Sequence, residues 1–227
     1  MKLDTNSNVY TIVYATIIVV IVALLLAVVS SALKPKQLAN VELDRKKQVL
    51  SSLNLKVDSL SKVTSIDELY GQLIDEQEIA GKQVFVAKTD DGTKYIIPMT
   101  GAGLWGAIWG YMALNDDCNT IYGTYFNHDS ETPGLGGEIT TRGFQTRFNG
   151  KHIKAADQYQ MEIVKGEAAD EQVQAISGAT ITSKGVETMI NSTLSEYKEF
   201  LTTSGKCNAS AETCAKADPE QNQEEVQ

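Results

Sequence analysis

The segment KQVFVAKTDDGTKYIIPMTG, residues 82–101, carries the strongest signal for secondary structure in this chain. Two runs rich in β-branched and aromatic residues flank Asp91-Gly92, a dipeptide typical of tight hairpin turns. The segment therefore predicts two neighbouring strands joined by a turn, and we expect the rest of the fold to form around them.

The sequence after this hairpin predicts further strands, a loop and a final helix. The glycine-rich segment 100–115 predicts a strand after its first turn, and residues 119–128 and 159–166 predict two more. Residues 131–137, ETPGLGG, predict a loop, because a proline and three glycines cannot stay in a regular element. Residues 182–203 predict the last helix, since apolar residues recur on one face at helical spacing: Val186, Met189, Ile190, Leu194, Tyr197 and Leu201.

The sequence before the hairpin predicts two helices. Residues 66–79 predict a short helix, and residues 34–55 predict a longer helix with a partial apolar face. Strands that are close in sequence and bracketed by helices indicate an α+β (mixed α/β) fold, with a mixed sheet packed by helices. The polar residues from Ser204 onward predict a disordered tail.

Residues 12–33, IVYATIIVVIVALLLAVVSSAL, form an uncharged apolar run long enough to cross a bilayer, which needs about 20 apolar residues. The alternative is a cleaved signal peptide, because the small residues 30–32 resemble a cleavage site. The run exceeds the apolar core of a typical signal peptide, about 7–15 residues, and only Lys2 precedes it as a basic residue. The sequence therefore favours one retained membrane anchor.

Composition and charge argue against two kinds of binding partner. The formal net charge is −9 and neither end carries a basic block, so nucleic acid is not an expected partner. The three cysteines form no C-x-x-C pair and the two histidines are far apart in sequence, so no metal site is expected. For Cys207 and Cys214 in the tail, a disulfide and free thiols both remain open.

Three glycine-rich segments are the candidates for a binding site: GAGLWG (101–106), ETPGLGG (131–137) and SGAT (177–180). Glycine lets a backbone turn sharply and approach a ligand closely. The helix predicted after SGAT would direct unpaired backbone N–H groups and its positive dipole end at a phosphate, with Lys184 adding a positive charge. The alternatives are ordinary turns and a well-capped helix start, and SGAT matches neither the Walker A pattern nor the dinucleotide-binding fingerprint.

Thr180 raises the question of covalent modification. A threonine hydroxyl needs an activating base to act as a nucleophile. The neighbouring sequence supplies no such base, so a modification of Thr180 would require another enzyme.

Residues 33–50, 101–139 and 177–186 together resemble the C-subunit of the Na+-translocating NADH:quinone reductase. The resemblance extends from the apolar run to about Phe200. It implies that FMN is joined through its phosphate to the last threonine of S-G-A-T, here Thr180. A separate flavin transferase would make this phosphoester with FAD as donor, which agrees with the missing base.

The resemblance also implies which residues surround the flavin. The ring would lie between Trp105 and Leu135, as suits a flat aromatic group that favours stacking and apolar cover. The alternative for Trp105 is core packing, for which Trp109 is the stronger candidate. His128 is expected beside the loop, and no residue is expected to be catalytic. The other expected cofactor-binding residues are Gly103, Leu104, Glu131, Thr132, Ser177, Gly178, Ala179 and Lys184.

Two features depart from the family pattern. Gln174 lies three residues before Ser177, where the flavin-transfer pattern usually has an aspartate, which puts the efficiency of flavin attachment in doubt. Basic residues after the apolar run outnumber Lys2 before it, so the positive-inside rule would place the large domain in the cytoplasm. The resemblance places the domain outside the cytoplasmic membrane, and we expect that orientation.

The resemblance implies an electron-transfer subunit of a membrane-bound NADH:quinone reductase, not an independent enzyme. It would be a single-pass protein of the bacterial inner membrane with its FMN domain on the periplasmic side. NADH, quinone and the sodium path would belong to other subunits, since the chain lacks a dinucleotide fingerprint and one apolar span forms no ion path. The expected partners are those subunits and the flavin transferase. The expected parts are a cytoplasmic N-terminus (1–10), a transmembrane helix (11–33), a membrane-proximal helix and linker (34–65), the FMN-binding domain (66–203) and the tail (204–227).

Two alternatives remain open from sequence. The G-subunit of the Rnf electron-transport complex, an ion-translocating ferredoxin:NAD oxidoreductase, shares S-G-A-T and the G-L-G loop, and it also carries covalent FMN. A non-redox, membrane-anchored assembly protein would use SGAT only as a helix cap.

Overall fold

The computed structural model describes residues 8–55, 65–79, 81–155, 158–169 and 171–203. The chain divides into two units, Met1–Arg45 and Lys46–Gln227. The predicted tail, with Cys207 and Cys214, lies outside the described residues.

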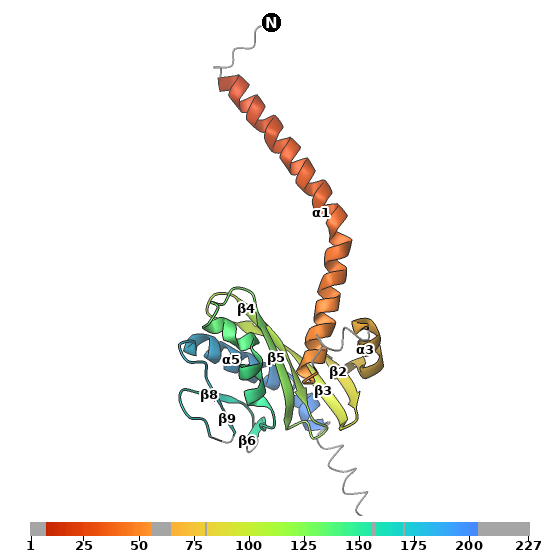
Figure 1. The fold of residues 1–227 in the computed structure, drawn as a ribbon, viewed down its shortest axis with the longest axis vertical. Helices are drawn as coiled ribbons and strands as arrows, with labels where there is room; N and C mark the ends of the chain where they lie inside the picture. The colour runs from red at the N-terminus through yellow and green to blue at the C-terminus, as the bar shows by residue number, and fades with distance from the viewer. Residues whose placement is uncertain (1–7, 56–64, 80, 156–157, 170, 204–227) are drawn as a thin grey trace, which may run out of the picture. The chain divides into compact units, whose positions relative to one another are not determined.

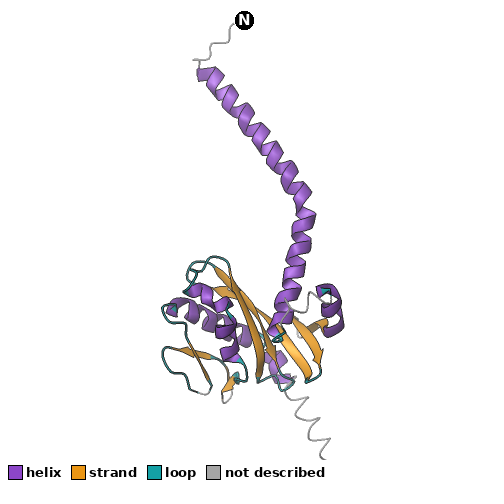
Figure 2. Cartoon of the chain, viewed as in Figure 1, coloured by secondary structure: helices purple, strands orange, loops and turns teal. Residues whose placement is uncertain are grey.

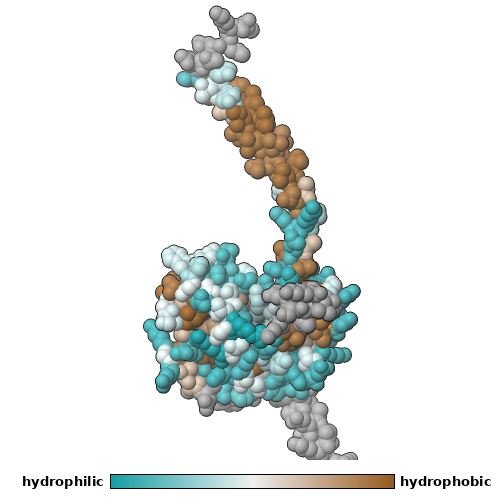
Figure 3. All heavy atoms as spheres, in the orientation of Figure 1, coloured by the Kyte–Doolittle hydropathy of each residue, from teal (hydrophilic) through white to brown (hydrophobic). Residues whose placement is uncertain are grey.

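The first unit is built on a long apolar helix, α1, which runs from Asn8 to Ser52 (Figure 1). Its apolar side chains are exposed over the predicted span, and Figure 3 shows a continuous hydrophobic surface along this part of the helix. The helix is long and apolar enough to cross a membrane and fits a single-pass anchor. The helix predicted over residues 34–55 is thus the continuation of the span.

The second unit contains a five-stranded antiparallel sheet in the order β1-β2-β3-β4-β5 (Figure 2). The predicted hairpin is confirmed, with Thr89 opposite Gly92 at the turn. The expected mixed sheet is wrong for these five strands, because each is joined to the next by a short connection that reverses its direction. The strands are β1 (Ile74–Ile79), β2 (Lys82–Thr89), β3 (Gly92–Ala102), β4 (Ala107–Leu114) and β5 (Ile121–His128).

The short helix predicted over residues 66–79 is only half correct. Helix α3 spans Ile66–Leu73, and the chain then enters β1 at Ile74. All six residues of β1 pair with β2, with Ile74 opposite Ala87. Pairing with the sheet edge therefore overrides the local helical pattern, as tertiary context often does.

The remaining elements follow β5 along the chain. The last helix, α5, is confirmed but begins earlier and ends earlier than predicted, at Thr180 and Glu196, and residues 198–203 are again helical. The strand predicted over 159–166 is interrupted: Tyr159 ends one short strand, and Glu162–Val164 forms another. This second strand pairs in parallel with β9. The elements between β5 and α5 are η1 (Gly136–Thr140), α4 (Arg142–Gln145), η2 (Thr146–Phe148), β6 (Lys154–Ala155), β7 (Gln158–Tyr159), β8 (Glu162–Val164) and β9 (Gln172–Gln174).

The sheet of the second unit buries both of its faces. Val84 and Val86 of β2 belong to a first core, which also contains all six apolar residues predicted for the last helix, four of them in α5 and two, Tyr197 and Leu201, just after it. Phe85 and Ala87, which alternate with the two valines, belong to a second core. Successive strand residues point to opposite faces, so this alternation places one core on each side of the sheet. The second core also contains Val49 and Leu50 from the end of α1, Leu53 just after it, and Ile66 and Tyr70 from α3.

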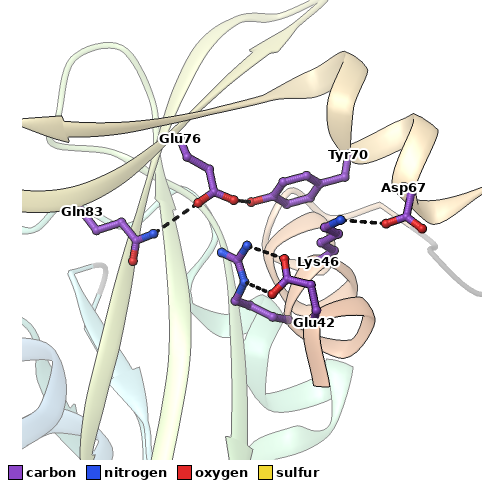
Figure 4. A network of polar contacts seen from close by, with 7 residues as sticks. Glu42, Lys46, Asp67, Tyr70, Glu76 and Gln83 are labelled. Carbon is purple, nitrogen blue, oxygen red and sulfur yellow. Dashed lines mark hydrogen bonds and ion pairs between the residues drawn. The ribbon is translucent and has the colours of Figure 1, made fainter. Parts of the chain in front are cut away.

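Polar contacts surround the second core (Figure 4). The ammonium group of Lys46 lies 2.7 Å from a carboxylate oxygen of Asp67 in α3. The Tyr70 hydroxyl donates to Glu76 at 2.7 Å, and the Gln83 amide donates to the other oxygen of Glu76 at 3.3 Å. These contacts join the last turns of α1, from Lys46 onward, to α3 and the sheet edge.

Candidate functional site

The first glycine-rich segment and the start of α5 are in direct contact. A Cβ atom on Gly101 would lie 2.7 Å from Cβ of Met189, and one on Gly185 would lie 2.6 Å from the carbonyl oxygen of Ala102. Such distances are shorter than real Cβ contacts, so both positions need glycine for this approach. The end of β3 therefore packs against the first turns of α5.

Glu131, in the ETPGLGG loop, is in contact with the GAGLWG segment and with the first turn of α5. Its side chain is 4 % exposed. One carboxylate oxygen accepts a hydrogen bond from the backbone N–H of Trp105 at 2.8 Å, and the other accepts one from the Thr182 hydroxyl at 2.7 Å. Cβ atoms on Gly103 and Gly136 would lie 2.4 and 2.3 Å from these oxygens. The carboxylate is therefore enclosed by the GAGLWG turn, its own loop and α5.

The hydrogen bonds to Glu131 determine its charge state. Burial alone raises the pKa of a carboxyl group. Here the donors outweigh burial and hold the pKa of Glu131 below its ordinary value; they are the backbone of Trp105, the Thr182 hydroxyl, and the backbone of Leu104 and Gly106. Glu131 is therefore an ionised carboxylate at neutral pH.

The ETPGLGG loop is held by its own backbone and by His128. The carbonyl oxygen of Thr132, an exposed residue, accepts hydrogen bonds from the N–H groups of Leu135 and Gly137 at 3.1 and 2.9 Å. The Glu131 N–H donates to Nδ1 of His128 at 3.2 Å. His128 therefore lies beside the loop and supports it, as expected.

The SGAT turn leads into α5 without a side-chain cap. Gly178 has φ +79°, and a Cβ atom there would lie 3.0 Å from a methyl carbon of Leu135. Ala179 is the N-cap residue of α5, and no side chain caps this end of the helix. The alternative of a helix start capped by SGAT side chains is therefore wrong. The buried Ser183 hydroxyl instead accepts a hydrogen bond from the Ile176 N–H at 3.1 Å, which joins the residue before the SGAT turn to the first turn of α5.

The hydroxyl groups of this segment differ sharply in exposure. Thr182 and Ser183 are each 1 % exposed, and both hydroxyls are engaged in hydrogen bonds. Thr180 and Ser177 are exposed. Thr180 is the first residue of α5, so its hydroxyl lies at the helix end where backbone N–H groups lack intrahelical partners.

Exposed apolar side chains are found on the GAGLWG segment, on the ETPGLGG loop and at the start of α5. Among the described residues from Lys46 onward, the large apolar side chains that are exposed are Leu104, Trp105, Leu135 and Ile181. Trp105 is 68 % exposed, so the alternative that it packs in the core is wrong. Trp109 is half-buried and donates to Gln48 at 3.1 Å. The sequence analysis did not identify Ile181 as a candidate site residue. Its position beside Thr180 and outside the predicted apolar face of the helix could have indicated it.

Lys184, an expected cofactor-binding residue, and Gln174, the departure from the family pattern, have partners away from the SGAT turn. The ammonium group of Lys184 forms an ion pair with Glu187, whose other oxygen accepts the Ile163 N–H at 3.0 Å. Gln174, at the end of β9, is exposed, and its carbonyl oxygen accepts a hydrogen bond from the Arg147 guanidinium at 2.8 Å. Arg147 thus fixes the chain just before SGAT, a role that the sequence analysis did not identify.

The described geometry agrees with comparisons with known proteins. The FMN-binding domain family matches residues 103–195, which include most of GAGLWG and all of ETPGLGG and SGAT. The C-subunit of the Na+-translocating NADH-quinone reductase of Pasteurella multocida is 31 % identical over 201 residues, covering 68 % of this chain and 77 % of the relative. The same subunit of Haemophilus ducreyi is 28 % identical over 233 residues, covering 82 % and 89 %. The crystal structure of the C-subunit from Parabacteroides distasonis superposes with a TM-score of 0.68 at 38 % identity, covering 75 % of this chain and 97 % of that one.

Proposed function

Because the chain belongs to the C-subunit family of the Na+-translocating NADH-quinone reductase, we propose that it carries FMN covalently on Thr180 and relays electrons between redox centres of that complex. The chain is then one subunit of a redox enzyme complex with an FMN-binding domain. Its partners are the neighbouring subunits and a flavin transferase.

One observation carries the choice of Thr180. Thr180 is exposed at the uncapped start of α5, whereas the hydroxyls of Thr182 and Ser183 are buried and hydrogen-bonded. The N–H groups and positive dipole end of a helix N-terminus favour a phosphate. A phosphate attached to the Thr180 hydroxyl would therefore be stabilised by α5 itself.

In the proposed attachment step, the FMN half of FAD is transferred to Thr180. The Thr180 oxygen forms a bond to the phosphorus of the FMN half, the diphosphate bond of FAD breaks, and AMP leaves. The hydroxyl proton passes to a base of the transferase. This chain supplies the acceptor and a defined turn around it.

The surrounding side chains fit a flavin ring. Trp105 and Leu135 are exposed apolar groups on two of the converging segments, and Leu135 lies over Gly178 of the SGAT turn. A flat aromatic ring buried between them would gain stacking and apolar burial that these side chains otherwise lack. Leu104 and Ile181 would extend this cover. Lys184 forms an ion pair with Glu187, so its positive charge would act on the flavin phosphate only from a distance.

The bound FMN would accept electrons from one redox centre and pass them to the next. The residues of this chain position the flavin, exclude water from its faces and hold its phosphate, which are the protein's usual contributions to cofactor chemistry. We propose that α1 anchors the subunit in the bacterial inner membrane with the FMN domain on the periplasmic side. Sodium transport would be a property of the assembled complex.

Mass spectrometry of the chain produced with and without a flavin transferase tests the proposal. Trypsin releases residues 166–184 as one peptide that contains Ser177, Thr180, Thr182 and Ser183. We expect this peptide to gain the mass of FMN less one water, with fragmentation assigning the gain to Thr180. Thr180→Val should abolish the gain. Thr188→Val, a matched change at an exposed position of the same helix, should not. An unmodified peptide in the presence of active transferase would contradict the proposal.

A further inference from the structure

Glu131 is bonded in a way that differs from a residue that merely lines a cofactor. Its carboxylate accepts hydrogen bonds from the β3–β4 turn, through Trp105, and from α5, through Thr182. Its own N–H donates to His128 at the end of β5. The Glu131 side chain thus joins the β3–β4 turn to α5, and its backbone joins the start of the loop to the end of β5.

The carboxylate is also enclosed on the sides where these segments approach. Gly103 and Gly136 leave no room for a Cβ atom beside its two oxygens. With 4 % of its surface exposed, Glu131 has both oxygens committed to the protein. Direct contact with a bound cofactor is therefore not its main role.

The residues connected to Glu131 are those that the proposed function requires. The backbone N–H of Trp105 donates a hydrogen bond to Glu131. The other donor, Thr182, follows Ile181 and lies two residues after Thr180. Leu135, over Gly178, belongs to the loop that Glu131 begins. A displaced carboxylate would let the turn, the loop and the helix start move independently.

We propose that Glu131 is a positioning residue that assembles the flavin-attachment site, fixing Trp105, Leu135 and the Thr180 hydroxyl relative to one another before any cofactor is bound. This inference rests on the proposed function and deepens it. Charge-assisted hydrogen bonds are about twice as strong as neutral ones, so one ionised side chain can hold three segments. Thr182 is the partner residue of Glu131 in this role, because its hydroxyl donates the hydrogen bond from α5.

Substitutions at the two ends of this contact separate positioning from folding. Glu131→Asp keeps the charge but shortens its reach, and Thr182→Val removes the donor at nearly constant volume. Thr182→Ser retains the hydroxyl and should rescue. In Glu131→Gln, the amide oxygen can still accept from Trp105 while the Thr182 hydroxyl turns to accept from the amide nitrogen, so this variant loses charge with less change in geometry. Glu199→Gln and Thr188→Val are matched controls at exposed positions.

The first readout is flavin transfer to the full-length chain in detergent. We expect the initial rate at Thr180 to fall roughly tenfold in Glu131→Asp and in Thr182→Val, as expected for the loss of one hydrogen bond to a charged group. The double variant should lose little more than either single variant, because both act through one contact. Thr182→Ser and both controls should retain the native rate.

The second readout needs no flavin. In a Trp109→Phe background, Trp105 is the remaining tryptophan, and its fluorescence anisotropy reports the mobility of the turn. We expect lower anisotropy in Glu131→Asp and Thr182→Val at unchanged far-ultraviolet circular dichroism. Native transfer rates and native anisotropy in both variants would overturn the inference. So would a slower rate in Thr182→Val that Thr182→Ser fails to rescue.

The two proposals fail in different ways. If the native chain is never modified at Thr180, the proposed function is wrong, while the anisotropy measurement still decides whether Glu131 orders the turn. If the native chain is modified and the Glu131 and Thr182 variants match it in rate and anisotropy, only the positioning role is wrong.

Discussion

A carboxylate held by neutral donors responds to acid differently from one held by a cation. The donors to Glu131 are backbone N–H groups and one hydroxyl, which do not titrate near neutral pH. The charge of Glu131 is therefore the only titrating part of this contact. Protonation would turn one of the two acceptor oxygens into a hydroxyl, from which the Thr182 hydroxyl could accept but the Trp105 N–H could not.

This predicts a defined pH dependence of stability. The pKa of Glu131 in the folded chain lies below its ordinary value of 4.5, because burial, which raises it, is outweighed by the hydrogen-bond donors. Its contribution to the free energy of unfolding is therefore complete above about pH 4.5 and is lost as the pH falls through the lower, folded-state pKa. We expect the difference in melting temperature between native chain and Glu131→Gln to be largest near pH 7 and to shrink below pH 4.5. A difference that stays constant down to pH 3 would contradict this account.

Cys118 makes a second prediction for a single residue. It is 1 % exposed, and burial, with the nearby charges of Asp117 and Asp116, raises the pKa of its thiol to about 12. The thiolate is the reactive form, so the native chain should not react with a thiol reagent at this site near pH 8. In a chain carrying Cys207→Ser and Cys214→Ser, we expect one reactive thiol in denaturant and almost none without it. Rapid labelling of the native chain would show that the site opens.

Among the elements, the contact between α5 and the end of β3 sets the geometry of the site. It depends on glycine at two facing positions, Gly101 and Gly185. The turn before α5 adds a third, Gly178, whose positive φ costs an ordinary residue about 1 kcal/mol or more.

Adding one methyl group tests this packing. In Gly185→Ala, the new Cβ atom would meet the Ala102 carbonyl at 2.6 Å, a backbone atom that cannot turn aside. We expect the free energy of unfolding to fall by about 1–3 kcal/mol and flavin transfer to slow, because the start of α5 must shift. Gly143→Ala is the control: this helical position has open space around it, and the change should be neutral or stabilising by up to about 1 kcal/mol. Thermal unfolding in detergent measures both, and equal melting temperatures for the two variants would contradict the close approach.

Local sequence predicted most of these elements. The Asp91-Gly92 turn predicted the central hairpin, and the spacing of Val186, Met189 and Ile190 predicted the buried face of α5. β1 was missed because Ile74 becomes a strand residue only through β2, a partner that no local pattern contains. The contacts of Glu131 with Trp105 and Thr182 were missed for the same reason. Family resemblance supplied Thr180, Trp105 and Leu135 as expected site residues, but it carried no information on what holds them in place.

For the molecule as a whole, the second core gives the end of α1 a role beyond anchoring. Val49 and Leu50 are fully buried and Leu53 is 2 % exposed, so α1 supplies part of the cover of the sheet. The second unit accordingly begins at Lys46.

Truncated chains can distinguish the two roles of α1, membrane anchoring and packing against the sheet. A chain beginning at Lys46 retains Val49, Leu50 and Leu53 and should fold without detergent. A chain beginning at Ser65 loses them, and burial of each such side chain contributes about 1.5–3 kcal/mol. That loss is comparable with a whole domain's stability of about 5–15 kcal/mol, so the shorter chain should aggregate or melt far earlier. Gel filtration and thermal unfolding compare the two, and equal stability would mean that α1 serves only as an anchor.

The hydrogen bond between Glu131 and Thr182 joins residues 51 positions apart in sequence. A nascent or misfolded chain contains the letters SGAT but not the arrangement that surrounds them once the sheet has closed. Flavin attachment would then serve as a quality check on biosynthesis, because a transferase that reads the assembled turn marks only finished molecules. The yellow fraction of a preparation would, on this view, count the chains that completed their fold before the cofactor arrived.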